Sequence, residues 1–143
     1  MPLLEKGVHA VTGRMPKVIS PKIHAIIDYG LAGSFLLMGV IAWKQRKHKS
    51  AISSFIVGGA ELGIALTTDY PGGVWKKIRF PTHGKIDAGF AGMIGSMPNI
   101  FGFDSAADTW FFRSQGMALA ATTGLTDFRG VESEPYSRRY RAA

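Results

Sequence analysis

The chain has 143 residues, with 17 Lys and Arg against 10 Asp and Glu, which gives a net charge of +7. This length fits one domain, or two small units that share a core. The chain has no cysteine, which excludes disulfides, thiolate metal sites and catalytic thiols. The basic balance indicates an anionic partner, either nucleic acid or the headgroups on the cytoplasmic side of a membrane.

Four apolar segments follow one another along the chain, at residues 23–43, 51–68, 86–103 and 109–126. Segments of this length would extend about 27–31 Å as helices, close to the thickness of the hydrocarbon core of a bilayer. Their apolar residues recur with a helical period and do not alternate as in strands. The pattern predicts an all-α fold with four transmembrane helices. A soluble four-helix bundle with glycine-rich helices is the alternative.

The basic residues fall on alternate connections. The stretch 1–22, the connection 69–85 and the tail 127–143 carry four Lys or Arg each, against four in the turn 44–50 and none in 104–108. By the positive-inside rule, both termini are cytoplasmic. The aromatic belts agree: the outer interface would hold Trp43 and Trp110, and the inner one Tyr70, Trp75 and Phe128. Nucleic acid is not expected as a partner, because its binding would not place charge on alternate connections.

The N-terminal segment 1–22 has no long apolar core followed by a cleavage site, so no signal peptide is predicted. This segment is expected to lie in the cytoplasm or along the inner interface. The tail 127–143 is expected to be cytoplasmic as well.

The chain contains an internal repeat. "HAIIDYGLAG", which begins at His24, and "HGKIDAGFAG", which begins at His83, are identical at six of ten positions. Further on, "GAELGIALTTDY" aligns with "MALAATTGLTDF", and both end in Thr-Asp-aromatic. The repeat predicts two tandem two-helix hairpins, 23–68 and 86–126, related by a pseudo-two-fold axis along the membrane normal.

Small residues four apart are expected to let the helices approach closely. They form three stripes: Gly59 and Gly63; Ala88, Gly92 and Ser96; Gly116, Ala120 and Gly124.

Between Ser20 and Asp127, the chain resembles the SPW-repeat integral membrane proteins of prokaryotes. The resemblance rests on "SPKIHAIIDY", "LTTDYPGGVWKKIRFPTHGKID", "SMPNIFGF" and "GLTDF"; the Ser-Pro-Trp signature itself is not matched, which makes this a divergent member. The resemblance implies two membrane hairpins in a prokaryotic plasma (inner) membrane. It implies no activity.

Polar and ionisable residues gather at the expected cytoplasmic ends of the helices. They are His24, Asp28, Glu61, Thr68, Asp69, His83, Asp87, Thr126 and Asp127. Each His-Asp pair is spaced by four residues and so shares a helix face. Because the two pairs are equivalent in the repeat, Asp28 and Asp87 are expected to act as equivalent partners in one network at the cytoplasmic end of the bundle. Carboxylates inside a membrane are costly and are functional candidates by default.

In a structural interpretation of this cluster, Ser20 and Thr82 cap helices. Two symmetric capping networks then connect His and Asp across the hairpins. The protein is then an accessory or structural subunit of a membrane complex, with the lipid bilayer, other subunits or further copies of itself as partners. No catalytic constellation is identifiable, and an enzyme is not predicted.

Three functional alternatives remain open. His24 and His83 could be paired ligands of a haem or a metal ion. A proton or ion pathway could run through Glu61, Asp28 and Asp87. The third alternative is a hydrolase built on His and Asp, for which no nucleophile is recognisable.

Overall fold

The computed structural model describes residues 15–129, and this part of the chain is helical. Its elements, in chain order, are α2 (Pro21–Lys44), α3 (His48–Thr67), β1 (Thr68–Asp69), β2 (Ile78–Arg79), α4 (Phe80–Phe101) and α5 (Ala106–Leu125). The predicted all-α class is confirmed. The expectations for residues 1–14 and for the basic tail from residue 130 onward lie outside the described residues.

The two helices of the first hairpin, α2 and α3, are long and apolar enough to cross a membrane. The second pair, α4 and α5, has the required length but does not reach the same level of hydropathy. Length and composition therefore identify two candidate spans among the described residues.

All four helices begin before the apolar segments that predicted them. The difference is largest for α4, which begins at Phe80 with Arg79 as its N-cap, whereas the apolar segment begins at residue 86. Hydropathy missed this first turn because His83 and Lys85 interrupt the apolar run without interrupting the helix. Thr82 lies inside the helix, so its predicted role as cap is wrong.

The predicted cap of α2 is confirmed. The hydroxyl of Ser20 accepts a hydrogen bond from the backbone N–H of Ile23 at 3.4 Å, and Pro21 occupies the first turn. A proline fits there because the first turn requires no backbone donor.

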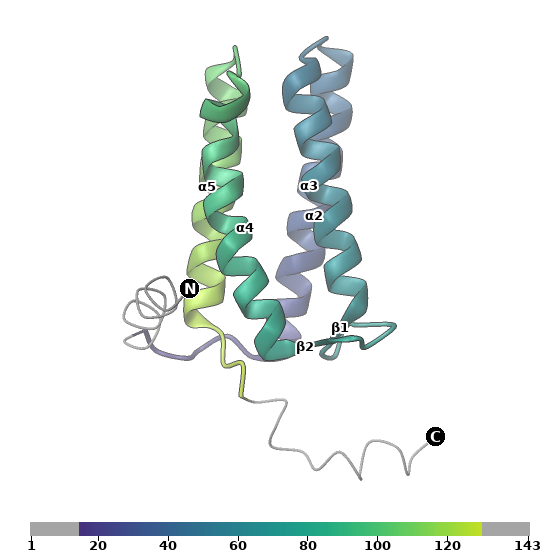
Figure 1. The fold of residues 1–143 in the computed structure, drawn as a ribbon, viewed down its shortest axis with the longest axis vertical. Helices are drawn as coiled ribbons and strands as arrows, with labels where there is room; N and C mark the ends of the chain where they lie inside the picture. The colour runs from purple at the N-terminus through teal and green to yellow at the C-terminus, as the bar shows by residue number, and fades with distance from the viewer. Residues whose placement is uncertain (1–14, 130–143) are drawn as a thin grey trace.

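The four helices form two hairpins that stand side by side (Figure 1). In the first hairpin α2 packs along α3, and in the second α4 packs along α5. The two strands, the start of α2 and the end of α5 all lie at one end of the molecule, which we call the strand end. The two tight turns within the hairpins lie at the opposite end, the turn end.

Short parallel pairings join the hairpins at the strand end. Thr68 and Asp69 of β1 pair with Ile78 and Arg79 of β2, which lead into α4. Ile19, which leads into α2, forms a bridge with Thr126 at the end of α5. Each pairing therefore joins the last residues of one hairpin to the segment that precedes the other hairpin.

Aromatic and aliphatic side chains from both hairpins form the main hydrophobic core. It contains Leu31, Phe35, Val57, Ala91, Ile94, Met97, Phe112 and Leu119. Phe35 of α2 meets Phe111 and Phe112 of α5 edge to face, with ring centroids 5.1 Å apart in both pairs.

In each hairpin, one glycine allows the two helices to approach closely. A Cβ on Gly116 would lie 2.8 Å from the carbonyl oxygen of Ala91, and one on Gly58 would lie 3.0 Å from the backbone nitrogen of Leu36. Packing at Gly116 was expected, but packing at Gly58 was not. The expected packing at Gly59 and Gly63, and at Gly92, is wrong: a Cβ at any of these three would meet open space.

Candidate functional site

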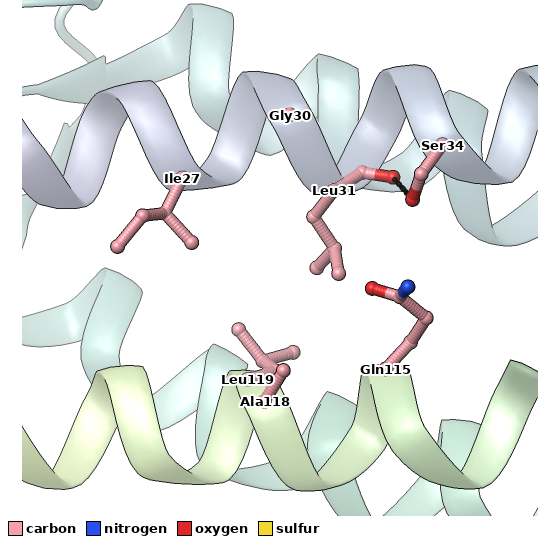
Figure 2. A pocket seen from close by; sticks show the side chains of 7 residues that line it. All are labelled: Ile27, Gly30, Leu31, Ser34, Gln115, Ala118 and Leu119. Atoms are coloured by element: carbon pink, nitrogen blue, oxygen red, sulfur yellow. Dashed lines mark hydrogen bonds between the residues drawn. The ribbon is translucent and has the colours of Figure 1, made fainter.

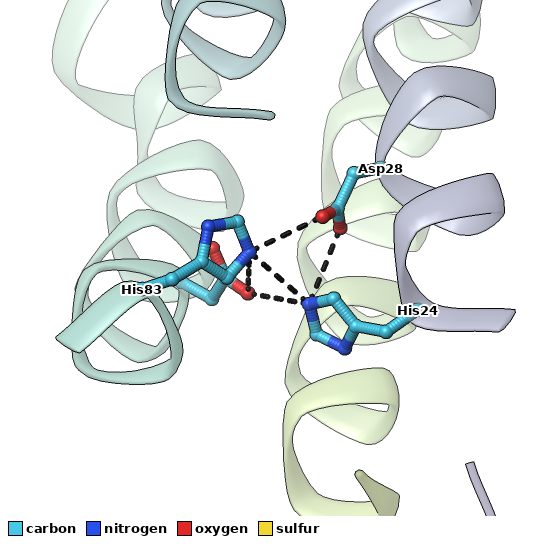
Figure 3. Close-up of side chains that lie close together, drawn as sticks. His24, Asp28 and His83 are labelled. Carbon is cyan, nitrogen blue, oxygen red and sulfur yellow. Dashed lines mark hydrogen bonds and ion pairs between the residues drawn. The ribbon is translucent and has the colours of Figure 1, made fainter. Parts of the chain in front are cut away.

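The polar residues of α2 and α4 meet in one buried cluster near the strand end (Figure 3). His24 and Asp28 lie one helical turn apart on α2, and His83 and Asp87 hold the same positions on α4. None of the four is more than 1% exposed. The helix spacing therefore places two imidazoles and two carboxylates opposite each other across the boundary between the hairpins.

The atoms at the centre are the Nε2 nitrogens of the two histidines, which are 3.2 Å apart. The Oδ2 of Asp87 lies 3.1 Å from Nε2 of His24 and 3.0 Å from Nε2 of His83. Asp28 offers one oxygen to each ring, with Oδ1 3.4 Å from His24 and Oδ2 3.2 Å from His83. Each carboxylate thus contacts both imidazoles.

Two threonines orient the imidazoles through their other ring nitrogen. The hydroxyl of Thr126 donates to the carbonyl oxygen of Thr122 at 2.6 Å and lies 2.7 Å from Nδ1 of His24. Likewise, the hydroxyl of Thr68 donates to the carbonyl oxygen of Ile64 in α3 and lies 2.8 Å from Nδ1 of His83. A hydroxyl has one proton, so each threonine accepts from Nδ1–H. In the neutral rings this leaves the Nε2 lone pairs directed into the cluster.

Aromatic rings cover the cluster on the side of the strand end. The rings of Phe80 and Phe128 meet His24 edge to face, at centroid distances of 5.3 and 5.5 Å. Tyr70 donates its hydroxyl to Oδ2 of Asp28 at 2.8 Å. Burial raises the pKa of Tyr70 above its ordinary value, and the negative charge of Asp28 raises it further. The Tyr70 hydroxyl therefore stays a proton donor.

Several carboxylate oxygens in and near the cluster lack a hydrogen-bond partner. They are Oδ1 of Asp28, Oδ1 of Asp87 and both oxygens of Glu61. Glu61 is 1% exposed and interacts electrostatically with both aspartates and with His83. A buried carboxylate oxygen is costly without a donor or a cation.

Not every predicted member joins the cluster. The structure brings His24, Asp28, His83, Asp87, Thr68 and Thr126 into direct contact, with Glu61 buried nearby. Asp69 instead lies 3.6 Å from the ammonium of Lys76, and Asp127 accepts the backbone N–H of Arg129. Each of these aspartates lies two residues beyond the end of a helix, α3 for Asp69 and α5 for Asp127.

The cluster agrees with the sequence in one respect and differs from it in another. The repeat predicted one network that contains both Asp28 and Asp87, and the structural interpretation predicted two symmetric networks; in the structure the equivalent residues converge on one centre. The aromatic cover of Tyr70, Phe80 and Phe128 was not predicted as part of the site. Its signal in the sequence is the aromatic residue that follows Thr-Asp in both halves of the repeat.

A haem does not fit between the histidines. Paired axial ligands stand on opposite faces of the macrocycle, whose plane must pass between the two nitrogens. Here Oδ2 of Asp87 lies within 3.1 Å of both nitrogens, and phenylalanine rings pack against His24. The space that the macrocycle needs is already filled by the protein.

A separate pocket of about 280 Å³ lies between α2 and α5 (Figure 2). Ile27, Leu31 and Leu119 give it a largely apolar lining, to which Ser34 and Gln115 add polar groups. The four His and Asp residues of the cluster do not line it.

The comparisons with known proteins found no match. No protein-family model, no curated protein and no solved structure is similar to this chain. Membership of the SPW-repeat family therefore stays a prediction.

Proposed function

We propose that this protein crosses a membrane four times and acts as a structural or accessory subunit of a membrane complex. Large apolar side chains on the outside of every helix support the four spans. Examples are Leu37, Ile56, Ile100 and Trp110, each at least 60% exposed. A face of this kind is stable against lipid tails and costly in water.

The inside of the bundle supports the same proposal. Hydroxyl groups are buried on α3 and α5, among them those of Ser53, Ser54 and Thr122. Membrane helices often place small and hydroxyl-bearing residues against one another, because lipid already solvates the apolar side chains. Four crossings would put the strand end, which includes the basic connection 69–85, in the cytoplasm.

Equivalent contacts in the two hairpins support a tandem duplication. His24 contacts Thr126 as His83 contacts Thr68, and Ile19 pairs with Thr126 as Ile78 pairs with Thr68. The equivalent residues stand 58 or 59 positions apart, as 83 − 24 = 59 and 126 − 68 = 58 show. We infer that the hairpin is the ancestral unit and that the cluster lies on its pseudo-two-fold axis.

The observation that carries the accessory role is the outward direction of Gly59 and Gly63. They lie four residues apart on α3 and no other part of the described chain packs against them. Such a pair lets a helix of another chain approach closely, with backbone against backbone. The closed cluster agrees with a structural role, because substrates in bulk water do not reach side chains that are 0–1% exposed.

Assembly in mild detergent tests this role. We expect the wild-type protein to migrate as a complex larger than one chain, and Gly63→Leu to release the monomer, because the added side chain separates the two helices. The control is Gly33→Leu, which adds the same side chain at another outward-facing glycine. The residues four positions away on either side, Tyr29 and Leu37, are large, so Gly33 does not belong to a stripe of small residues. Unchanged migration of Gly63→Leu, or wild-type protein that is already monomeric, would contradict the role.

A further inference from the structure

The histidines and aspartates direct four hydrogen-bond acceptors toward one point. Each imidazole uses its Nδ1–H on a threonine, which leaves Nε2 of His24 and His83 facing the centre. The carboxylates of Asp28 and Asp87 face the same centre, and each keeps one oxygen without a hydrogen-bond partner. Acceptors that are this close and buried repel one another unless protons or a metal cation lie among them.

Five separations in the cluster, which involve both oxygens of Asp28, are close to the edge length of a metal coordination tetrahedron. Ligands at 2.0–2.1 Å from a four-coordinate zinc ion stand about 3.3 Å from one another. The five N···N and N···O separations within the cluster range from 3.0 to 3.4 Å. All four residues can contribute ligand atoms that lie within 4.8 Å of one another.

Charge and ligand orientation agree with a divalent ion. Two aspartates and two neutral imidazoles carry a charge of −2, so one divalent ion makes the buried centre neutral. A metal-bound histidine ordinarily donates its other ring N–H to an oxygen that fixes its orientation. Thr126 and Thr68 supply those oxygens here.

We propose that His24, Asp28, His83 and Asp87 bind one divalent transition-metal ion in tetrahedral geometry, with zinc as the best match. Nitrogen and carboxylate ligands at these separations suit zinc, whereas magnesium and calcium require six or more oxygen ligands and longer or octahedral arrangements. All four ligand positions are taken by protein atoms, so the ion is structural. It connects α2 to α4 and therefore links the two hairpins.

This site is independent of the proposed assembly role, because every ligand belongs to one chain. The ion would stabilise the strand end whether or not Gly59 and Gly63 contact another subunit. Failure of the assembly experiment would therefore leave the metal site intact, and the reverse also holds.

The first test is metal stoichiometry. Full-length protein is purified in detergent through a streptavidin-binding tag, because a polyhistidine tag would itself bind metal. We expect about one zinc ion per chain, which a chelator removes and Co²⁺ replaces with the strong visible absorption of four-coordinate cobalt. Removal of the ion should lower the unfolding temperature. Folded protein that binds no stoichiometric Zn²⁺ or Co²⁺, so that protons alone occupy the cluster, would overturn the proposal.

Variants identify the ligands. His24→Ala should weaken Co²⁺ binding at least about tenfold, and Thr126→Val, which removes the orienting oxygen, should weaken it about 10- to 100-fold. Matched controls are His48→Ala and Asp127→Asn, which change a histidine at the turn end and an aspartate outside the cluster. Controls that weaken binding as much as His24→Ala would overturn the assignment.

One variant keeps four ligands and so avoids the risk that the protein fails to fold. In Asp87→Cys, a thiolate replaces a carboxylate, and Co²⁺ should gain a thiolate-to-cobalt charge-transfer band in the near ultraviolet. The natural chain has no cysteine, so this band can arise only from position 87. Folded Asp87→Cys protein that binds Co²⁺ without the band would show that Asp87 is not a ligand.

Discussion

At the scale of single residues, the two aspartates have equivalent positions and a shared environment. Asp28 and Asp87 each contact both His24 and His83, although they come from different hairpins. They differ in one contact, since only Asp28 accepts the hydroxyl of Tyr70. Substitution of either one therefore disturbs the same four side chains.

This shared environment predicts non-additive stability effects. Asp28→Asn and Asp87→Asn should each lower the free energy of unfolding by about 1–3 kcal/mol, because each leaves buried polar groups half-satisfied. The double variant should lose less than the sum, since the second change acts on a cluster that the first has already disrupted. Thermal unfolding in detergent measures all three. Full additivity, or two single variants as stable as wild type, would show that the aspartates do not belong to one network.

The sequence predicted the ligand residues better than their arrangement. The four-residue His-Asp spacing put each pair on one helix face, and this is a local property of a helix. The repeat predicted that Asp28 and Asp87 share one network, but which atoms meet across the hairpins depends on how the helices pack, and the sequence pattern does not contain that information. Asp69 and Asp127 were therefore grouped with the cluster although they lie just beyond the helix ends.

At the scale of helices, hydropathy located all four elements and misplaced their ends. The apolar pattern identifies residues that would contact lipid or the protein core. A helix also includes polar turns at its ends, which the pattern does not detect. Thus α4 contains His83 and Lys85 before its apolar stretch begins. The small-residue stripes on α3 and α4 were assigned to the wrong face for a similar reason. Gly58 and Gly59 are neighbours in the chain, and only the packed structure shows that Gly58 faces α2.

The two kinds of glycine should respond differently to a methyl group. Gly116→Ala should lower the free energy of unfolding by about 1–3 kcal/mol, because its Cβ would lie 2.8 Å from the carbonyl oxygen of Ala91 and force the helices apart. Gly59→Ala should leave stability unchanged or raise it, since its Cβ would meet open space and alanine favours the helix. Thermal unfolding in detergent compares the two. A Gly59→Ala protein that is less stable than Gly116→Ala would contradict the packing described here.

At the scale of the whole molecule, the proposed membrane topology explains three features together. In the described part of the chain, the strand end includes the basic connection 69–85, large apolar side chains are exposed on all four helices, and the carboxylates of Asp28 and Asp87 are enclosed between the hairpins. The tandem hairpin was predicted from the sequence because both halves of the repeat keep the His-Asp spacing. Hydropathy alone supports only α2 and α3 as spans, because α4 and α5 carry more polar residues. The second hairpin is therefore the part of the topology that most needs a direct test.

Accessibility of single cysteines to a membrane-impermeant maleimide, applied to intact cells, tests the four crossings most directly. The natural chain has no cysteine, so each variant reports one position. Gln45→Cys and Asp104→Cys probe the two exposed turns at the turn end, and Lys77→Cys probes the strand end. We expect Gln45→Cys and Asp104→Cys to be labelled from outside, and Lys77→Cys only after the membrane is permeabilised. Labelling of Gln45→Cys without Asp104→Cys would show that α4 and α5 do not cross the membrane, and labelling of Lys77→Cys in intact cells would show that the orientation is reversed.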